Sequence, residues 1–425
     1  MGISASPASE TLRVWLADLQ RAADLRRQHH MQRILRPVQS AQGATVEIQG
    51  RSYVQFCTNN YLGLANDPEV IDAARAAISR YGAGAGASRL VAGSMDLHHQ
   101  LEQALADFKR TEAALLFPTG FMANLAVLTT FAGPLDRIVS DKLNHASLLD
   151  AARWSGANHR TFPHKNIDRA KELLVRKISP AGRHGRQSPA SPDSPPPARA
   201  ARTLLVSDSV FSMDGDVADL AALSAAAESA GALLVADEAH ATGVLGEHGR
   251  GVGELAGVEG NIAVSVGTLS KAFGSVGGFV TGSQAVIDTL VNEARSFIYT
   301  TALPPGCSAA ALAALKIMLR RPQLRHRVLT MAAGVRNRLE AMGYDCGHSR
   351  SPIIPVICGS TESALEASEF LRQSGIFVPA IRPPTVAPGS ARLRLSLMAT
   401  HSDGQIEFLL EQMAQLRDHL LVRPS

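Results

Sequence analysis

The chain has 425 residues, 45% of them hydrophobic, and at roughly 150 residues per domain this length predicts two or three units with buried cores. Its formal charge is +4, but residues 176–203 hold six of the 42 Lys and Arg and only one acid, so the rest of the chain is close to neutral. This local basicity does not indicate a nucleic-acid partner. Four widely spaced cysteines argue against a disulfide scaffold and a cysteine-ligated metal site.

The first predicted element is an amphipathic helix over residues 9–30, in which Leu12, Trp15, Leu16 and Leu19 recur at helical spacing. We expect its apolar face to pack on the rest of the protein. Two brief strands around a glycine turn follow in VEIQGRSYVQF, at 46–56.

Helices and strands then alternate. The predicted helices are 68–80, 96–110 and 218–230, and the predicted strands are 113–117, 136–140 and 203–207. The segments ALLVAD (232–237) and IAVSVG (262–267) are short, β-branched and unalternating, which is typical of strands buried on both faces of a mostly parallel sheet. This pattern predicts an α/β architecture with crossover helices on both faces.

After LPPG the pattern changes to that of a smaller α+β domain. It comprises predicted helices at 307–320, 324–342 and 361–374, and strands at 353–358 and 391–397. We therefore divide the chain into an N-terminal helix with short strands (1–55), a large domain (56–305) and a small C-terminal domain (306–425).

Residues 176–203 interrupt the large domain with six prolines and almost no large apolar side chains. This composition predicts a disordered surface insertion that leaves catalysis unaffected. The sequence has no apolar run of the roughly eighteen residues that a membrane span requires, and no apolar signal core. We expect a cytoplasmic protein with no membrane partner.

Three short motifs fail on their context. GAGAGA (82–87) follows a predicted helix where a dinucleotide-binding loop needs a strand. DEAH (237–240) occurs without any phosphate-binding G-x-x-x-x-G-K-[ST] loop. The adjacent pairs His29-His30 and His98-His99 lack the spacing of metal ligands. Nicotinamide chemistry, ATP hydrolysis and metal catalysis are therefore disfavoured.

Several chemically useful side chains follow predicted strands. Lys271 comes directly after IAVSVG, and Asp237 ends ALLVAD, with His240 three residues later. A third strand runs into SDSVFSMDGD, which brings Asp208 and Ser212 to the same edge. The carboxyl ends of parallel strands form the ligand-binding edge of such sheets.

A separate strand ends in FPTGF and opens a helix, so the amides of Gly120 and Phe121 are placed to bind an anion. A lysine for a Schiff base, an aspartate for a pyridinium nitrogen, amides for a phosphate, and hydroxyl and imidazole groups for a phenolate describe one cofactor. The set predicts pyridoxal 5′-phosphate (PLP).

The chain closely resembles the α-oxoamine synthase family of fold-type I PLP enzymes. The resemblance covers roughly residues 20–420 apart from 176–203. It is carried by NNYLGL, GAGASRLVAG, FPTGF, DKLNHASLLD, SVFSMDGD, DEAHATG, GTLSKAFGSVGG, FIYTTALPP and IRPPTVAPGSARLRLSLMATH. It implies a fold-type I transferase whose sites form across a homodimer interface.

The resemblance also implies roles for individual residues. Lys271 would hold PLP covalently, His145 would stack on its ring and Asp237 would pair with the ring nitrogen. The remaining contacts would be Gly120, Phe121 and Thr268 at the phosphate, Ser212 and His240 at the phenolate, Ala239 on the second ring face, and Arg394, Asn59, Arg33 and Thr385 at the substrates. Arg392 is the alternative to Arg394, because both lie on the same face of a strand.

The implied reaction is a decarboxylative condensation of an amino acid with an acyl thioester. IRPPTVAPGSARLRLSL favours L-alanine with a pimeloyl thioester, carried by coenzyme A or by a carrier protein, as in biotin biosynthesis. The alternative within the family is condensation of glycine with acetyl-CoA. A non-catalytic PLP-binding protein is disfavoured, since the full set of reactive groups is present.

Overall fold

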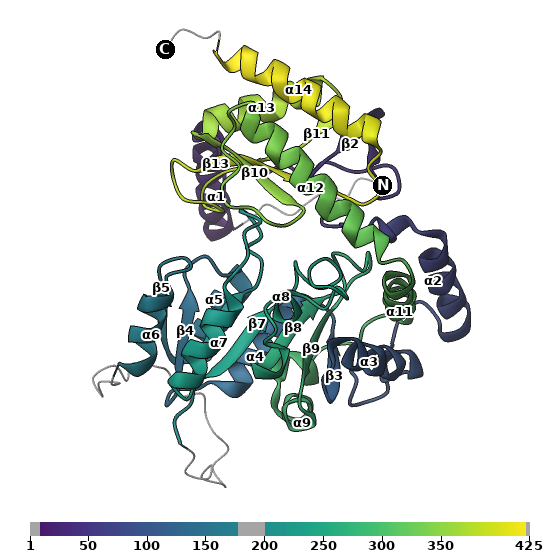
Figure 1. Cartoon of the computed structure of the whole chain (residues 1–425), viewed down its shortest axis with the longest axis vertical. Coiled ribbons are helices and arrows are strands. Elements are labelled where there is room, and N and C mark those ends of the chain that lie inside the picture. Colours follow the sequence, from purple (N-terminus) through teal and green to yellow (C-terminus); the bar gives the residue numbers. More distant parts are fainter. Residues whose placement is uncertain (1–8, 177–199, 422–425) are drawn as a thin grey trace.

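The structure is a computed structural model that describes residues 9–176 and 200–421. Most of the segment 176–203, for which the sequence predicts disorder, therefore lies outside the described residues. The chain forms a large body around a seven-stranded sheet and a smaller body above it (Figure 1).

The seven-stranded sheet has the order β3-β9-β8-β7-β6-β4-β5. Its strands are β3 (Ala113–Phe117), β4 (Arg137–Asp141), β5 (Asn158–Phe162), β6 (Thr203–Asp208), β7 (Leu233–Asp237), β8 (Ile262–Thr268) and β9 (Gly278–Gly282). All are parallel except β9, which runs antiparallel to both of its neighbours. The predicted mostly parallel sheet is confirmed, whereas β5 and β9 were not anticipated.

Helices cover both faces of this sheet, as predicted. In β6 the alternate residues Leu204 and Val206 pack with α4 and α5, while Leu205 packs in the core that includes α3, α6 and α7. The helices of the large body are α2 (Pro68–Tyr81), α3 (Asp96–Lys109), α4 (Gly120–Phe131), α5 (Ala146–Trp154), α6 (Ile167–Val175), α7 (Leu220–Ser229), α8 (Val252–Leu255), α9 (Gln284–Glu293) and α10 (Arg295–Ile298).

The smaller body contains two three-stranded sheets, β10-β13-β12 and β1-β2-β11. Their strands are β1 (Thr45–Ile48), β2 (Arg51–Gln55), β10 (Ile353–Gly359), β11 (Ile376–Phe377), β12 (Ala380–Ile381) and β13 (Ala391–Ser396). The accompanying helices are α12 (Gln323–Ala341), α13 (Thr361–Gln373) and α14 (Asp403–Leu421), and α11 (Pro305–Arg320) precedes them in the chain.

Packing suggests domain boundaries that differ from those expected from the sequence. Because β2 pairs with β11, we propose that the strands of the 1–55 segment belong with the small domain. Helix α11 packs against α2 and α3, so we propose that it belongs with the large domain.

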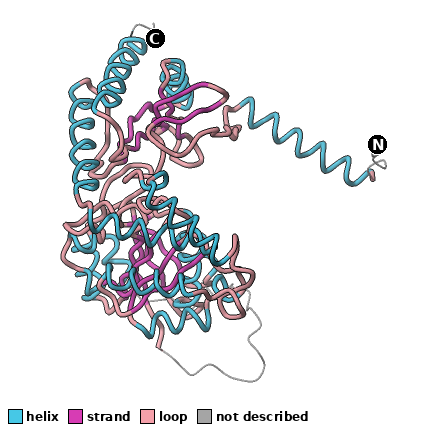
Figure 2. Tube along the Cα trace, turned by 90° about the vertical axis from the view of Figure 1, so that its right-hand side faces the viewer, coloured by secondary structure: helices cyan, strands magenta, loops and turns pink. Residues whose placement is uncertain are grey.

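Helix α1 (Glu10–Gln28) forms where the sequence predicts it, and the Ser9 hydroxyl caps it by accepting from Leu12 N at 3.3 Å. None of its residues is buried, and Figure 2 shows it extending away from the two bodies. The expectation that its apolar face packs on the rest of the same chain is wrong. The apolar spacing predicted the helix, but a single sequence does not show which surface covers it.

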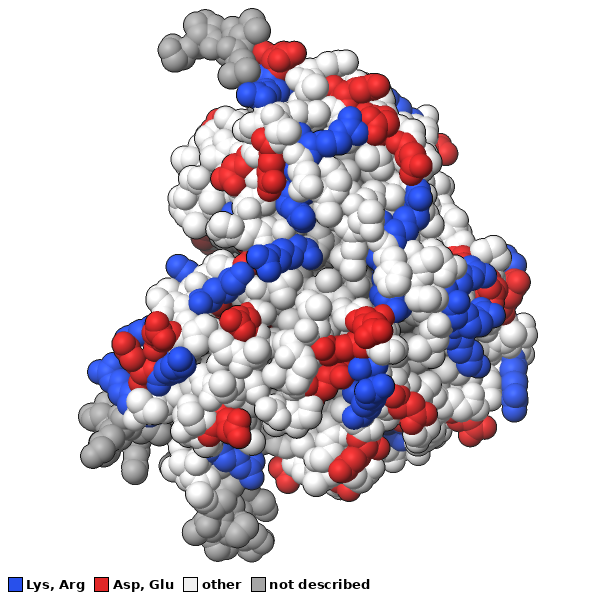
Figure 3. All heavy atoms as spheres, viewed as in Figure 1, with Lys and Arg blue, Asp and Glu red and all other residues white. Residues whose placement is uncertain are grey.

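Among the described helices, none is long and apolar enough to cross a membrane. Positive and negative side chains are interspersed over the face shown in Figure 3.

Candidate active site

One polar cavity of about 240 Å³ lies at the carboxyl edge of the large sheet, where the neighbouring strands β6 and β7 place Asp208 opposite Asp237. All eight residues predicted to bind the cofactor line it: Gly120, Phe121, His145, Ser212, Asp237, His240, Thr268 and Lys271. Ala239, predicted to cover the second ring face, also lines the cavity. The fold therefore brings together residues that are up to 151 positions apart in the sequence, at the strand ends where they were predicted to meet.

Lys271 is the third residue after the end of β8 and is partly buried. Burial lowers the pKa of its ammonium group to about 8, although the negative charges of Asp237 and Asp208 oppose this shift. Near physiological pH, a lysine with this pKa has a far larger neutral fraction than an ordinary lysine, although most of it is still protonated. Its amine can therefore act as a nucleophile or as a base.

Asp237 is buried, and both of its carboxylate oxygens accept hydrogen bonds. Asn124 Nδ2 donates to Oδ2 at 2.6 Å, and the Ala239 amide donates to Oδ1 at 2.9 Å. Sequence reasoning missed Asn124, which lies one helical turn after Gly120 on α4 and faces the same cavity. Its buried Oδ1 has no hydrogen-bond partner among the described residues.

His145 precedes α5, and its Nδ1 lies 2.7 Å from Ser147 Oγ. Ser147 Oγ also accepts from Asn124 Nδ2 at 2.9 Å, which links the imidazole through two side chains to Asp237. Burial lowers the pKa of His145, against the charge of Asp237. A neutral imidazole is the form suited to lie flat against an aromatic ring.

The amino terminus of α4 forms the anion-binding end of the cavity. Thr119 caps the helix by accepting from Met122 N at 3.2 Å, and the first amides, those of Gly120 and Phe121, have no acceptor within a helix. The hydroxyls of Thr268 and Ser270 lie 2.7 Å apart beside them. Amide donors, hydroxyls and the positive end of the helix dipole together suit a phosphate.

His240 also lines the cavity, and its Nδ1 lies 2.7 Å from the hydroxyl of Tyr61. Burial, followed by the positive charge of Lys271, holds the pKa of His240 well below its ordinary value. Tyr61 is fully buried and lies within NNYLGL, and no sequence pattern predicts its contact with His240.

Asp208 contributes a second carboxylate near Asp237. It is buried and accepts from the His145 amide at 2.7 Å. Burial and then the charge of Asp237 raise its pKa well above the ordinary value.

The structure separates the two candidate arginines on β13. Arg392 pairs with the carboxylate of Asp214 and also donates to the Ser390 carbonyl at 3.0 Å. Arg394 donates to neutral oxygens: to Asn59 Oδ1 at 3.1 Å, to Ser396 Oγ at 2.9 Å and to the Ser212 carbonyl. Within the described residues no carboxylate pairs with Arg394, which therefore has a charge available for an anionic substrate.

Asn59 and Arg394 do not line the cavity themselves, but Arg394 bonds both to Asn59 and to the lining residue Ser212. The last two predicted substrate contacts lie farther from the cavity. Arg33 and Thr385 are both exposed and meet each other, with the guanidinium 3.4 Å from the threonine hydroxyl. Arg382 fixes the same segment by donating to the Gln32 carbonyl. The structure thus brings the 31–36 and 382–385 segments together without joining them to the cofactor cavity.

Comparison with known proteins identifies the family. Residues 51–413 match the family described as Aminotransferase class I and II. The chain belongs to this family. Among its relatives, the 8-amino-7-oxononanoate synthase of Geobacter sulfurreducens is 43% identical over 93% of this chain and 96% of its own. The enzyme of the same name from Pseudomonas fluorescens is 42% identical, over 96% and 99%.

Solved structures of family members have the same fold. The Sphingomonas wittichii serine palmitoyltransferase superposes with a TM-score of 0.86 at 31% identity, covering 98% of this chain and all of its own. The 8-amino-7-oxononanoate synthase of Francisella tularensis gives 0.71 at 28% identity, covering 87% and 99%. A serine palmitoyltransferase from S. paucimobilis, at 0.86 and 30%, contains bound PLP. The fold-type I prediction is confirmed, and this protein is a PLP-dependent transferase.

The residues of the cavity fit PLP. Lys271 provides an amine with a lowered pKa, Asp237 a fixed anion, and α4 a phosphate-binding terminus. Close approach of the backbone at the phosphate end requires Gly278, because a Cβ there would lie 2.5 Å from the Thr119 carbonyl oxygen. Each of the cofactor's polar groups therefore has a chemically matched partner.

Proposed function

We propose that this protein condenses L-alanine with a pimeloyl thioester, releasing carbon dioxide and a free thiol, to form 8-amino-7-oxononanoate for biotin biosynthesis. The observation that carries the proposal is the guanidinium of Arg394, which donates to the cavity residue Ser212 and has no carboxylate partner among the described residues, in a chain whose relatives carry the name 8-amino-7-oxononanoate synthase. An α-amino acid offers the carboxylate that such an arginine binds in two-point fashion.

Each residue has a defined task in this proposal. Bound PLP supplies an electron sink for negative charge that develops at the substrate Cα. Asp237 keeps the ring nitrogen protonated, and Asn124 and the Ala239 amide keep Asp237 in place. Lys271 Nζ holds the cofactor before the reaction and accepts the Cα proton once alanine has replaced it.

The remaining residues orient the reactants. Arg394 holds the alanine carboxylate, and Asn59 and Ser212 fix its guanidinium from two sides. His145 covers one ring face, while Ser212 and His240 bind the phenolate oxygen. We propose that Arg33 and Thr385 contact the acyl substrate, because they lie outside the cofactor cavity and are exposed.

We also propose that two copies of the chain form the working enzyme. Phe121 lines the cavity yet is 40% exposed, and it contacts Trp154, which is 63% exposed. Helix α1 presents six more exposed large apolar side chains. Exposed apolar surface of this kind next to a site indicates a protein interface. A second copy would cover these side chains, and residues 297–305 would serve its site.

The reaction can be tested with isotopes. Purified protein with PLP, pimeloyl-CoA and alanine labelled in its carboxyl carbon should release the label as carbon dioxide. Mass spectrometry should detect unlabelled 8-amino-7-oxononanoate in equal amount with free thiol. Retention of the label in the product would rule out the decarboxylation. Product from serine with palmitoyl-CoA instead would favour the activity of the structural neighbours.

A further inference from the structure

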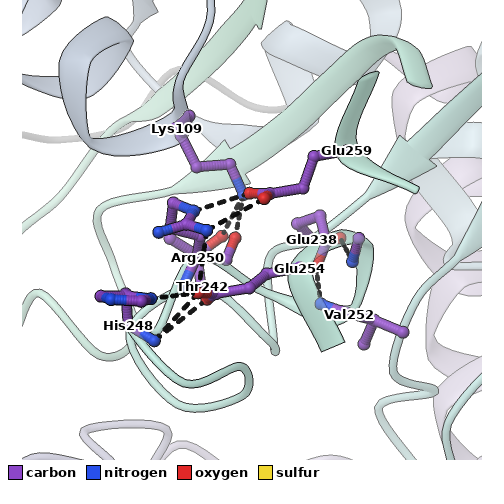
Figure 4. A network of polar contacts seen from close by, with 9 residues as sticks. Lys109, Glu238, Thr242, His248, Arg250, Val252, Glu254 and Glu259 are labelled. Carbon is purple, nitrogen blue, oxygen red and sulfur yellow. Dashed lines mark hydrogen bonds and ion pairs between the residues drawn. The ribbon is translucent and has the colours of Figure 1, made fainter. Parts of the chain in front are cut away.

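Glu238 lies between two residues of the cofactor cavity, Asp237 and Ala239, but does not line the cavity itself. Its side chain is 1% exposed and points into the body of the large domain. Successive side chains at the end of a strand point to opposite sides, so Asp237 faces the cofactor and Glu238 faces away. Figure 4 shows the Glu238 carboxylate directed at the start of α8.

Both oxygens of this carboxylate are held by neutral donors. Oε2 accepts from Ser209 Oγ at 3.0 Å and from Val252 N at 2.9 Å, and Oε1 accepts from Gly253 N at 2.8 Å. The approach requires a glycine at 251, where φ is +123° and a Cβ would lie 2.2 Å from Glu238 Oε2. A buried carboxylate with three donors has one preferred position.

The backbone of Glu238 is fixed as well. Its amide donates to the Val266 carbonyl at 2.7 Å, and its carbonyl accepts from the amides of Ala241 at 3.0 Å and Thr242 at 2.8 Å. Side-chain and backbone bonds therefore hold the turn that carries Asp237 on one side and His240 on the other.

A second polar network holds the donors of α8 in place (Figure 4). Arg250 pairs with Glu254 at 2.9 Å and with Glu259 at 2.7 Å, and the Glu254 carboxylate lies 2.6 Å from the His248 imidazole. Lys109 Nζ donates to the Arg250 carbonyl and to Thr242 Oγ1. These bonds fix the loop before α8, so Glu238 binds to a rigid support.

We infer that Glu238 is a positioning residue for the cofactor site, whose carboxylate sets the direction in which Asp237 and His240 meet PLP. The inference rests on the proposed function to the extent that these two residues contact the cofactor. In the DEAH motif, Asp237 and His240 would contact the cofactor, whereas Glu238 would hold the turn that carries them.

The test uses Glu238→Gln, with Glu254→Gln as the matched control in the adjoining network. In glutamine an NH2 group, which can only donate, replaces one of the two carboxylate oxygens. At least one of the three donors around residue 238 therefore loses its acceptor. We expect the PLP dissociation constant of Glu238→Gln to rise about tenfold or more. The visible circular dichroism of bound PLP should also change, because it reports the ring's orientation.

The control should lower the melting temperature but leave the circular dichroism of bound PLP as in the wild type. Equal changes in both variants, or none in Glu238→Gln, would overturn the inference. If Glu238→Gln does not fold, Ser209→Ala removes one of the three bonds and should change both readouts in the same direction by less; unchanged readouts in that variant would also overturn it. Neither readout needs a substrate, so a failed condensation assay leaves this result intact.

Discussion

Arg392 and Arg394 differ in their surroundings although they share one face of β13. Asp214 occupies the guanidinium of Arg392, whereas Arg394 contacts neutral oxygens. Strand alternation predicts that both side chains reach the same side, and it cannot show which of them already has an anionic partner. That partner comes from the 209–218 loop, which lies far away in sequence.

Alanine substitutions should separate the two arginines. Arg394→Ala should raise the KM for the amino acid roughly a hundredfold with little change in PLP affinity, because the lost charge-assisted bonds go to the substrate carboxylate. Arg392→Ala should mainly reduce the stability of the protein. Steady-state kinetics and cofactor titration on both variants make the comparison. A larger KM effect in Arg392→Ala would reverse the assignment.

Lys271 should be the residue that carries PLP. Borohydride reduction of the holoenzyme should fix the cofactor mass on the peptide containing Lys271 and leave Lys109, the other buried lysine with a lowered pKa, unlabelled. The rate of PLP attachment to cofactor-free protein should rise with pH around a midpoint of about 8, since the neutral amine is the nucleophile. A label on Lys109 would contradict the site.

The residues that sequence reasoning missed share a physical cause. Asn124, Ser147 and Tyr61 act by contacting Asp237, His145 and His240, and none of them carries a group whose chemistry stands out alone. Strand-end positions identified the reactive groups because parallel strands end at a common edge. The side chains that orient those groups come from helices and loops, whose mutual placement requires the folded chain.

At the scale of elements, the loop 209–218 connects the two bodies. Its carbonyls at Ser212 and Met213 accept from the arginines of β13, and Asp216 fastens its other end to the large sheet. There His164 lies between two carboxylates, with Nδ1 3.1 Å from Asp141 and Nε2 2.9 Å from Asp216. The ring also packs edge-on against Phe211, with ring centroids 4.3 Å apart.

This cluster predicts a pH-dependent contribution to stability. Burial alone would lower the pKa of His164, but its bonds to Asp141 and Asp216 raise it to about 9. A raised histidine pKa stabilises the folded state fully below the unfolded value of about 6.5, and this stabilisation is lost as the pH rises through 9. The pKa of Asp216 is lowered from its ordinary value of 3.8. The stability that Asp216 contributes is therefore lost in acid, as the pH falls below that value.

The stability difference between wild type and His164→Asn should therefore be largest near pH 6, at most about 3 kcal/mol, and should shrink toward pH 9.5. Urea unfolding at several pH values measures it. His326→Asn, which changes an exposed histidine on α12, serves as the control. A difference that stays constant from pH 6 to 9.5 would show that His164 is not held as a cation.

Five of the seven strands of the large sheet were predicted, and β5 and β9 were missed; β9 is the more informative of the two. Its sequence, GFVTG, has a glycine at each end and follows the glycine-rich loop after Lys271. It therefore resembles a loop, although Gly278 is required by the backbone packed against it. Its antiparallel direction depends on how the loop 269–277 reverses the chain after β8, which hydrophobic periodicity does not encode.

At the scale of the whole molecule, α1 and the Phe121–Trp154 pair leave apolar surface that a single chain does not bury. If two copies associate through these side chains, Leu16→Glu should raise the dimer dissociation constant at least tenfold, because a charge would enter the apolar interface. Ala17→Glu places the same charge on the opposite face of α1 and should have little effect. Analytical ultracentrifugation of the wild type and both variants measures the dimer dissociation constants. A wild type that is monomeric at micromolar concentration would refute the dimer.

The central claim is the pairing of L-alanine with a pimeloyl thioester at the Lys271 site. Arg394 recognises any α-amino acid, so the choice of substrate rests on the space beside Cα and on the acyl channel, where one methyl group changes the rate by tens- to a hundredfold. The most direct measurement is kcat/KM for alanine with pimeloyl-CoA against glycine with acetyl-CoA on the same preparation. We predict that the first pair exceeds the second by at least tenfold. A higher value for glycine with acetyl-CoA would contradict the proposed function while leaving the fold and the cofactor site unchanged.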